Sequence, residues 1–145
     1  MGLNEAMDIN VSGIEAQRIA MELIASNIAN INTTRTVYGG PYRRRVAVLS
    51  DRGLTFDGEL DLAESRLNRK GGGVEVVDIV EDTAPFPKVY QPGHPDADRE
   101  GFLALPNVNL ATEMVGLTYT QRLYEANITA FNASKKMMQD TLQLQ

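Results

Sequence analysis

The residues best suited to chemistry lie around the single histidine. His94 stands in the segment 91–95 (QPGHP), and the chain of 145 residues has no cysteine. A catalytic triad or a histidine-rich metal site requires several partner side chains. One histidine without any cysteine does not supply them within one chain. We therefore expect His94 to have a structural role in a rigid turn.

The segment that follows resembles the beginning of a calcium-binding loop. Asp96, Asp98 and Glu100 would offer oxygen ligands at positions 1, 3 and 5, and Gly101 stands at position 6. The twelfth position, which carries a bidentate glutamate in such loops, is Asn107. Prolines also replace the helix that would enter the loop. The pattern therefore favours a solvated polar turn over a cation site.

Two further segments have features of phosphate binding. The triple glycine at 71–73 lacks the following Gly-Lys-Ser/Thr of a phosphate loop, and a strand rather than a helix is expected after it. The arginines at 43–45 precede an apolar alternation, which is typical of a solvated strand edge. The formal net charge is -5, so we expect no nucleic-acid or anionic-membrane partner. The sequence indicates a protein that is not an enzyme and has no cofactor or metal.

Neither a secretory signal nor a membrane span is expected. Glu5 and Asp8 stand where a signal peptide would carry basic residues, and the first ten residues lack a continuous apolar core. No stretch approaches 18 consecutive apolar residues. A protein of this kind would leave the cytoplasm only by another export route.

The chain begins with a segment that we expect to form a long helix. Its apolar residues recur with the 4-3 spacing of a coiled-coil seam. This N-terminal seam consists of Met7, Val11, Ile14, Arg18, Met21, Ala25 and Ile28. A second apolar line suggests contact with more than one neighbour, and it holds Ile9, Ala16, Ala20, Leu23 and Ile24. The asparagines of 27–32 are expected to end the helix in a left-handed conformation.

A longer seam closes the chain. This C-terminal seam consists of Leu110, Met114, Leu117, Gln121, Tyr124, Ile128, Phe131, Lys135, Met138 and Leu142. Asn109 is the expected N-cap, and Glu113 in the first turn suits the helix dipole. A helix over 109–144 would be about 54 Å long, whereas a compact chain of this size is roughly 38 Å across. Its own domain would not cover this helix.

These patterns predict an α+β fold. Two long terminal helices would pack as an antiparallel coiled-coil-like pair, with Ile14, Met21 and Ile28 against the C-terminal seam. The far part of the second helix, with Phe131 and Met138, would extend beyond the first and need another subunit. An ordinary antiparallel helix pair inside one domain is the alternative, and it leaves only that far part uncovered.

The middle of the chain is expected to be a small β-rich domain. All six prolines fall between 33 and 106, as do alternating segments around 43–49 and expected strands at 74–80 and 88–90. The stretch 50–70 is polar and weakly patterned, so we expect a variable loop there. The predicted units are therefore an N-terminal assembly segment at 1–32, a β-rich middle at 33–106 and a C-terminal assembly segment at 107–145.

Short motifs along the chain resemble the flagellar rod and hook protein family. The end of the first helix resembles the family's N-terminal signature at Ser26, Asn27, Ala29, Asn30, Asn32 and Thr33. The match continues in order through nearly the whole chain and resembles the proximal rod proteins of that family. The positions that carry it are Pro41, Tyr42, Tyr90, Pro92, His94, Pro95, Pro106, Asn107 and Val108.

The resemblance implies a structural subunit of the proximal rod of the bacterial flagellar basal body. Such a subunit would be exported unfolded through the flagellar type III apparatus, assemble in the periplasm without a cleaved leader, and help to transmit motor torque. Implied partners are other copies and neighbouring rod proteins such as FlgB, FlgF and FliE. The alternative function is a soluble coiled-coil adaptor or export chaperone, which would not need the proline-rich middle.

We expect the terminal helices to fold as they assemble, because isolated helices are seldom stable in water. The expected assembly interface consists of the apolar seam residues together with Ile24. It comprises Met7, Val11, Ile14, Met21, Ile24, Ile28, Leu110, Met114, Leu117, Tyr124, Ile128, Phe131, Met138 and Leu142.

Overall fold

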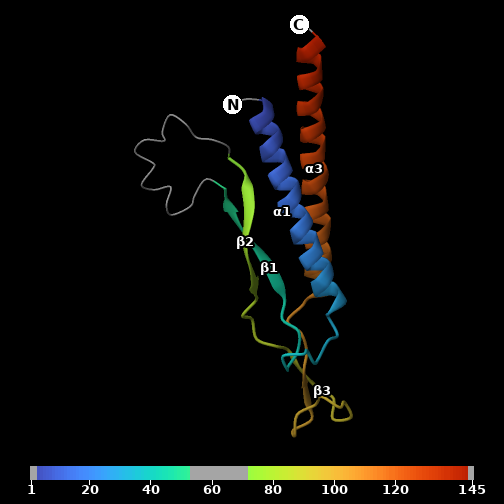
Figure 1. Cartoon of the computed structure of the whole chain (residues 1–145). Coiled ribbons are helices and arrows are strands. Elements are labelled where there is room, and N and C mark those ends of the chain that lie inside the picture. Colours follow the sequence, from blue (N-terminus) through green and yellow to red (C-terminus); the bar gives the residue numbers. More distant parts are fainter. Residues whose placement is uncertain (1–2, 53–71, 144–145) are drawn as a thin grey trace, which may run out of the picture.

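Two long helices and two small β-ribbons form the part of the chain that the structure, a computed structural model, describes, namely residues 3–52 and 72–143 (Figure 1). The elements in order are α1 (Leu3–Ala29), β1 (Arg45–Asp51), β2 (Val74–Glu81), β3 (Lys88–Tyr90), β4 (Phe102–Ala104) and α3 (Leu110–Gln143). The chain is therefore α+β, with a helix at each end and antiparallel strands between them. Most of the expected loop at 50–70 lies outside the described residues.

The two helices lie side by side, with the beginning of α1 and the end of α3 at the same end of the molecule (Figure 1). Asn27 of α1 donates a hydrogen bond to Glu113 of α3 at 3.1 Å. Nearer that common end, a Cβ atom placed on Gly13 would lie 2.8 Å from Nδ2 of Asn127. Gly13 and Asn27 are fourteen residues apart in α1, and Glu113 and Asn127 are fourteen residues apart in α3. The two helices therefore keep one register over this length.

Small and polar residues form the line of contact between the helices. The contact line is defined by Gly13 and Asn27 of α1 and by Glu113 and Asn127 of α3, with the buried Thr120 and Ser134 on the same side of α3, whereas the buried Ser12 contacts the start of β2. By contrast, Val11, Arg18 and Ala25 of the N-terminal seam are exposed. Ile14, Met21 and Ile28 are half-buried, and their packing against the C-terminal seam stays a prediction. Small side chains allow the two backbones to approach, and the Asn27–Glu113 hydrogen bond fixes the rotation of the helices about their axes.

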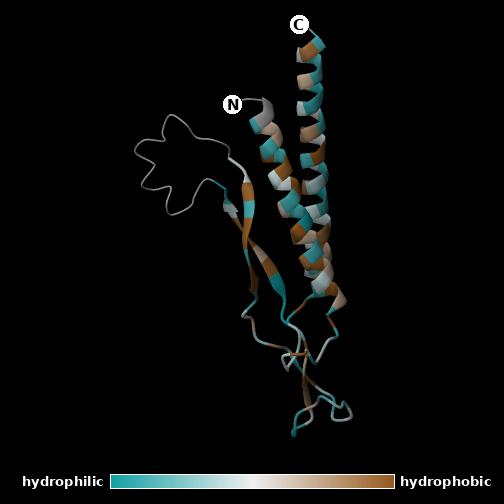
Figure 2. Cartoon of the chain, in the orientation of Figure 1, coloured by the Kyte–Doolittle hydropathy of each residue, from teal (hydrophilic) through white to brown (hydrophobic). Residues whose placement is uncertain are grey.

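The residues of both seams are half-buried or exposed in the helix pair. Hydrophobic and hydrophilic residues are interspersed along both helices (Figure 2). With the register set by Gly13 and Asn127, Phe131 lies level with Ile9 of α1, and the nearby Ser134 is buried. The prediction that Phe131 extends beyond α1 is therefore wrong, because α1 is long enough to reach it. The last part of α3, from Met138 onward, does extend past the beginning of α1.

The first β-ribbon lies along α1. β1 and β2 are antiparallel, with Arg45 opposite Glu81 and a register shift between Val48 and Leu49. At the start of β2, the backbone N–H of Val74 donates to Oγ of Ser12 at 3.1 Å, which attaches the ribbon to the helix. The strand predicted at 74–80 is confirmed at Val74–Glu81.

The second ribbon extends away from the helices. The predicted strand at 88–90 is confirmed as β3, and it pairs with β4, which the sequence patterns did not reveal. The rings of Tyr90 and Phe102 pack edge to face, with centroids 5.5 Å apart. Three residues were too few for an alternation to be visible in β4, because a period of two needs at least four positions.

The two helix ends depend on asparagine in different ways. Oδ1 of Asn109 accepts the N–H of Thr112 at 3.2 Å, so the expected N-cap of α3 is confirmed. At the end of α1, the amide of Asn30 donates to the carbonyl of Ser26 at 2.9 Å. No described residue other than glycine has a positive φ, so the expected left-handed asparagine is not present there. None of the described helices is long and apolar enough to cross a membrane.

Candidate functional site

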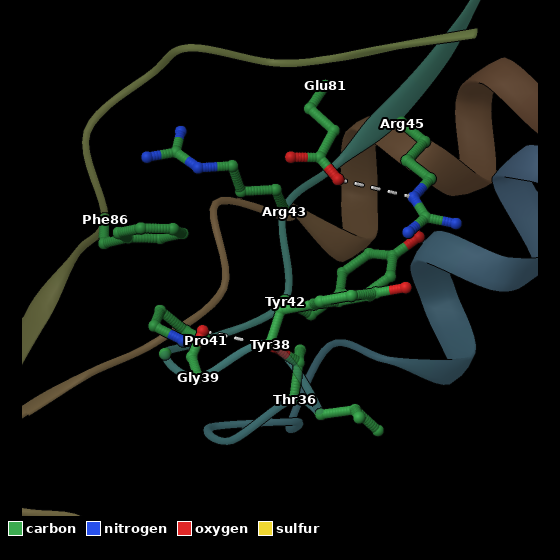
Figure 3. Close-up of a pocket in the computed structure, with 11 residues that line it drawn as sticks. Thr36, Tyr38, Gly39, Pro41, Tyr42, Arg43, Arg45, Glu81 and Phe86 are labelled. Carbon is green, nitrogen blue, oxygen red and sulfur yellow. Dashed lines mark hydrogen bonds and ion pairs between the residues drawn. The ribbon is translucent and has the colours of Figure 1, made fainter.

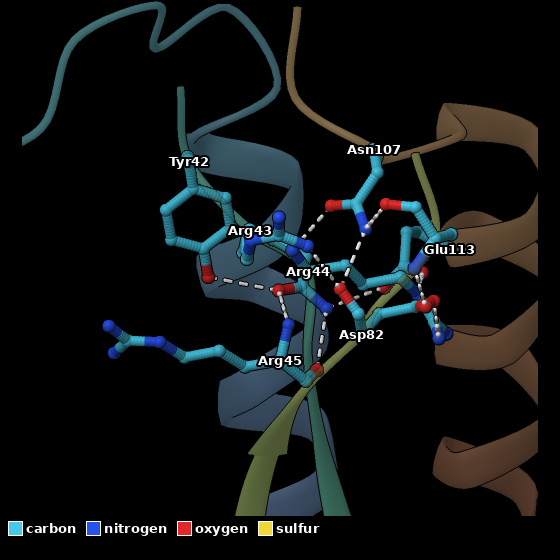
Figure 4. A network of polar contacts seen from close by, with 9 residues as sticks. Tyr42, Arg43, Arg44, Arg45, Asp82, Asn107 and Glu113 are labelled. Carbon is cyan, nitrogen blue, oxygen red and sulfur yellow. Dashed lines mark hydrogen bonds and ion pairs between the residues drawn. The ribbon is translucent and has the colours of Figure 1, made fainter. Parts of the chain in front are cut away.

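A cluster of hydrogen-bonded side chains lies where the end of α1, the entry to β1 and the beginning of α3 meet (Figure 4). We call this cluster the polar clasp. Its side chains come from five separate segments of the chain and converge at one end of the helix pair. The clasp consists of Asn27, Tyr42, Arg44, Asp82, Asn107 and Glu113.

Asn27 is the centre of the clasp and is 0% exposed. Its Nδ2 group donates to the backbone oxygen of Arg45 at 3.0 Å and to Oε2 of Glu113 at 3.1 Å. Its Oδ1 atom accepts the N–H of Arg45 and the hydroxyl of Tyr42, both at 2.9 Å. Both donors and both lone pairs of the amide are therefore used. Only an amide side chain combines two donors with an acceptor of this size.

Glu113 brings a carboxylate into the same buried space and is 1% exposed. Its Oε1 atom accepts a hydrogen bond from Nε of Arg44 at 2.6 Å, and Arg44 also lies 3.6 Å from the carboxylate of Asp82. A buried charge that is paired and hydrogen-bonded in this way is tolerated, whereas removal of its partner would leave it uncompensated. Glu113 thus ties α3 to the entry of β1.

Asn107 attaches the segment before α3 to the same cluster. Its Oδ1 atom accepts the backbone N–H of Arg44 at 2.8 Å, and its Nδ2 group donates to the backbone oxygen of Asp82 at 3.1 Å. No buried side-chain nitrogen or oxygen of the described residues lacks a hydrogen-bond partner. A fully satisfied polar network of this kind specifies one arrangement of the segments that it joins.

Of the arginines at 43–45, which the sequence predicted as a solvated strand edge, Arg45 is an exposed residue of β1, whereas Arg43 and Arg44 are half-buried and precede the strand. Arg44 is engaged by Glu113, as described above. The guanidinium of Arg43 lies 4.3 Å from the ring centroid of Phe86, and Nε of Arg45 lies 3.7 Å from Glu81. Their partners are distant in the sequence, so the local pattern did not indicate them. These contacts leave the arginine run poorly suited to bind phosphate.

The motif positions separate into two groups. Ser26, Asn30 and Thr33 join Asn27 and Tyr42 at the end of α1, where the N–H of Tyr42 donates to the backbone oxygen of Thr33 at 3.0 Å. Asn107 completes this group, while Ala29 and Asn32 are exposed and Pro41 and Val108 are half-buried. Tyr90, Pro92, His94 and Pro95 lie instead in the second ribbon and its turn, and Pro106 is buried before α3.

The turn of the second ribbon is held by polar contacts within the chain. Nδ1 of His94 accepts the N–H of Asp96 at 3.1 Å, and Thr34 donates to the carboxylate of Asp96 at 2.9 Å. Oδ1 of Asp98 accepts the N–H groups of Glu100 and Phe102, each at 2.9 Å. Within residues 3–52 and 72–143, no group of three acidic, histidine or cysteine side chains could hold a metal ion.

The loop before Pro41 carries two hydrophobic side chains that sequence reasoning missed. Val37 is 100% exposed and Tyr38 is 97% exposed. The loop covers a hollow of ≈ 460 Å³ that is also lined by Tyr42, Arg45 and Phe86 (Figure 3). The charged groups lining this hollow are paired with neighbours, so no set of free polar groups converges there. The hollow therefore lacks the features of a catalytic pocket.

The described residues bury very little hydrophobic surface. The buried hydrophobic residues are only Ala16, Tyr42 and Leu103 within the described part of the chain. None of the fourteen predicted interface residues is buried, and Leu110, Met114 and Leu142 are among the exposed ones. Large exposed apolar faces indicate a site of interaction with another protein.

Comparison with known protein families first defines the class of protein to which the chain belongs. Residues 7–35 match the family described as flagella basal body rod protein, and residues 99–144 match the C-terminal part of the flagellar basal body rod FlgEFG proteins. The first range spans most of α1, and the second range contains β4 and α3. The two matched ranges thus include both helices of the contact line and half of the polar clasp.

Curated relatives narrow the class. The flagellar basal-body rod protein FlgC of Bacillus subtilis is 41% identical over 96% of this chain and 95% of its own length. The FlgC proteins of Borreliella burgdorferi and Salmonella typhimurium are 39% and 36% identical, over 98% and 99% of this chain and 97% and 98% of their own lengths. The chain therefore belongs to the FlgC family of flagellar basal-body rod proteins.

Family membership decides between the functions considered from the sequence. The chain is a structural subunit of the flagellar basal-body rod and not an enzyme, and it assembles with other rod proteins. The alternative of a soluble adaptor or export chaperone is set aside by the same relatives. The polar clasp is thus a structural site.

Proposed function

We propose that this subunit is exported unfolded through the flagellar type III apparatus and polymerises in the periplasmic space through its terminal segments, 1–32 and 107–145. Its partners there are other copies of the chain and neighbouring rod proteins such as FlgB, FlgF and FliE. The middle segment, 33–106, lies beside the helices and contributes less to polymerisation. The assembled subunits form the shaft of the proximal rod that transmits motor torque.

The observation that supports this proposal is that no residue of either seam is fully buried in a single chain. Burial of apolar surface contributes roughly 25 cal/mol per Å², and the seams gain only part of it within the subunit. Neighbouring subunits that cover the seams would supply this stabilisation. The helix pair would then act as an antiparallel coiled-coil-like unit whose knobs-into-holes packing is completed by other chains.

The polar clasp has a complementary role in this proposal. It joins α1, α3 and the entry to β1 at one end of the helix pair. Because every polar group in it is paired, the angle between the helices and the ribbon is fixed when the subunit is folded. With a fixed angle, torque applied to the helices would be transmitted to the outer segments without a change in the shape of the subunit. This rigidity is what a rotating rod requires.

An interface variant tests the proposal. Ile128 is a half-buried residue of the C-terminal seam, and Asn132 is an exposed residue one turn further on. We expect Ile128→Asp to abolish rods and motility in cells whose own copy is deleted, because a carboxylate in an apolar interface loses its hydration. Asn132→Asp, the matched control, should leave motility intact. Normal rods built from the Ile128→Asp chain would overturn the proposal.

A further inference from the structure

A second apolar surface runs along α3, separate from the C-terminal seam. Its residues recur at intervals of three or four positions, with one gap of seven positions that contains Arg122. All of these residues are exposed. Val115 is 71% exposed and Tyr119 is 64% exposed, which is unusual for large hydrophobic side chains in an otherwise ordered helix. We call this surface the outer stripe, and it consists of Val115, Tyr119, Ala126, Ala130, Ala133 and Met137.

The outer stripe does not face α1 of its own chain. The contact line on α3 passes through Glu113, Thr120 and Ser134. At 3.6 residues per turn, the outer stripe lies roughly 100° around α3 from that line, on the side away from the C-terminal seam. The N-terminal seam likewise lies roughly 130° around α1 from its own contact line. Each subunit therefore presents two unlike apolar surfaces, one on each helix.

Residue sizes on the two surfaces match at several levels when one helix is shifted by four residues. If α1 of one copy packs antiparallel on α3 of the next with a shift of four residues from the register within the chain, Val11 lies level with Ala133 and Ile14 lies level with Ala130. Tyr119 then lies level with Ala25. Large side chains thus meet small ones at these three levels, an arrangement that favours close packing of helices, while Met7 lies level with Met137 at the end of the surface.

Charge disfavours the position without a shift. Without it, the register of the chain, set by Gly13 and Asn127, would place Arg18 of one copy level with Arg122 of the next. Two like charges facing each other in an interface are unfavourable, so this position is disfavoured. The four-residue shift moves Arg18 to the level of Ala126, where its aliphatic part can cover the small side chain.

We propose that the N-terminal seam of one copy docks on the outer stripe of the next copy, with an axial step of about 6 Å between them. This inference rests on the proposed function, because it concerns the same polymer, and it specifies which surfaces meet. The two surfaces are different, so the contact is heterologous and can repeat in an open helical series. The C-terminal seam remains available for other neighbours.

Paired cysteines test the contact, since the natural chain has no cysteine. Val11→Cys with Ala133→Cys places one thiol on each proposed surface, and a disulfide requires Cα atoms within about 7 Å. In isolated rods, mild oxidation should link successive copies into a ladder of multimers that a reductant dissolves. Each single-cysteine chain should give no ladder. The ladder pattern is read on non-reducing gels.

The matched control is Val11→Cys with Ala130→Cys, which tests the contact without the axial step. We expect the Ala133 pair to give the stronger ladder. A ladder from the Ala130 pair alone would overturn the four-residue step. Intact rods without a ladder from either pair would overturn the docking itself, while the proposed function would still stand on the outcome of the Ile128 variant.

A variant with a larger side chain on the outer stripe tests the docking if the paired cysteines prevent assembly. Ala130→Phe adds a ring to the centre of the outer stripe and should lower the number of rods per cell at least about fivefold. Ala130→Ser, which hardly changes the volume, should leave that number unchanged. Equal rod numbers from the two variants would contradict the proposal, because an uncovered surface would accept the ring without cost.

Discussion

The polar clasp and the outer helix faces show opposite patterns of burial. At the clasp, an amide and a carboxylate are nearly inaccessible to solvent, and every described polar side chain that is buried has a partner. On the outer faces, Met114 and Val115 are exposed although neither side chain has a polar group that needs contact with water. A monomeric globular protein would have the reverse arrangement. The difference supports our proposal that the clasp sets the shape of the subunit and that the apolar faces stabilise the polymer.

The largest expected effect on the subunit comes from the clasp carboxylate. Glu113→Ala would leave Arg44 close to Asp82 but would remove the buried partner of the guanidinium and of Asn27. We expect the free energy of unfolding of the full chain to fall by about 3–5 kcal/mol. Denaturant titration followed by circular dichroism measures this change. Glu125→Ala, at an exposed position of the same helix, is the control, and an equal loss there would show that the clasp has no special role.

A smaller effect is expected at the contact line. A Cβ atom on Gly13 would already lie 2.8 Å from the amide of Asn127, so Gly13→Leu should push the helices apart. Overpacking of this kind typically costs about 1–3 kcal/mol. The measurement is the same titration, with Gly93→Leu as the control because no atom lies within 4 Å of the Cβ position there. An unchanged midpoint for the Gly13 variant would contradict close packing between α1 and α3.

A single hydrogen bond of the clasp should have an effect of about 1 kcal/mol. Tyr42→Phe removes the hydroxyl that donates to Asn27 at 2.9 Å and keeps the ring in place. Tyr38→Phe is the matched control, because that tyrosine is almost fully exposed. We expect a lower unfolding midpoint for the first variant only. Identical midpoints would mean that the amide of Asn27 is satisfied without the hydroxyl.

The smallest effect on stability is expected on the outer faces. Met114→Gln, at an exposed position of the C-terminal seam, should change the free energy of unfolding by no more than about 0.5 kcal/mol. The same variant should nevertheless reduce rod assembly, because the polar side chain would be buried against a neighbouring subunit. Parallel measurement of unfolding and motility separates the two effects. A large loss of stability would place Met114 in an intramolecular core.

The sequence predicted the helices well because their patterns are long. Seams of seven and ten positions indicated α1 and α3, and Asn109 indicated where α3 begins. The face on which the helices meet was not predictable in the same way. A seam identifies an apolar stripe, but the closest approach of the helices is at Gly13, which is small, and spacing rules give more weight to large side chains.

The clasp was only partly visible in the sequence. The family resemblance drew attention to Asn27, Tyr42 and Asn107, whereas Glu113 was interpreted as a charge that suits the helix dipole. Its partner, Arg44, lies 69 residues away, so no local pattern connects the two. A carboxylate in the first turn of an otherwise apolar helix face was the available signal, and its interpretation required the three-dimensional fold.

Oxidation of methionines tests the central claim most directly, namely that the apolar helix faces are open in the subunit and covered in the rod. Peroxide converts accessible methionines to sulfoxides, and Met114 and Met137 lie on the two exposed faces of α3. Mass spectrometry of the free full-length chain and of isolated rods gives the extent of oxidation at each position. We predict fast oxidation of both residues in the free chain and strong protection in rods. Equal protection of both residues in the two states would contradict the account, because the faces would then be covered within a single subunit.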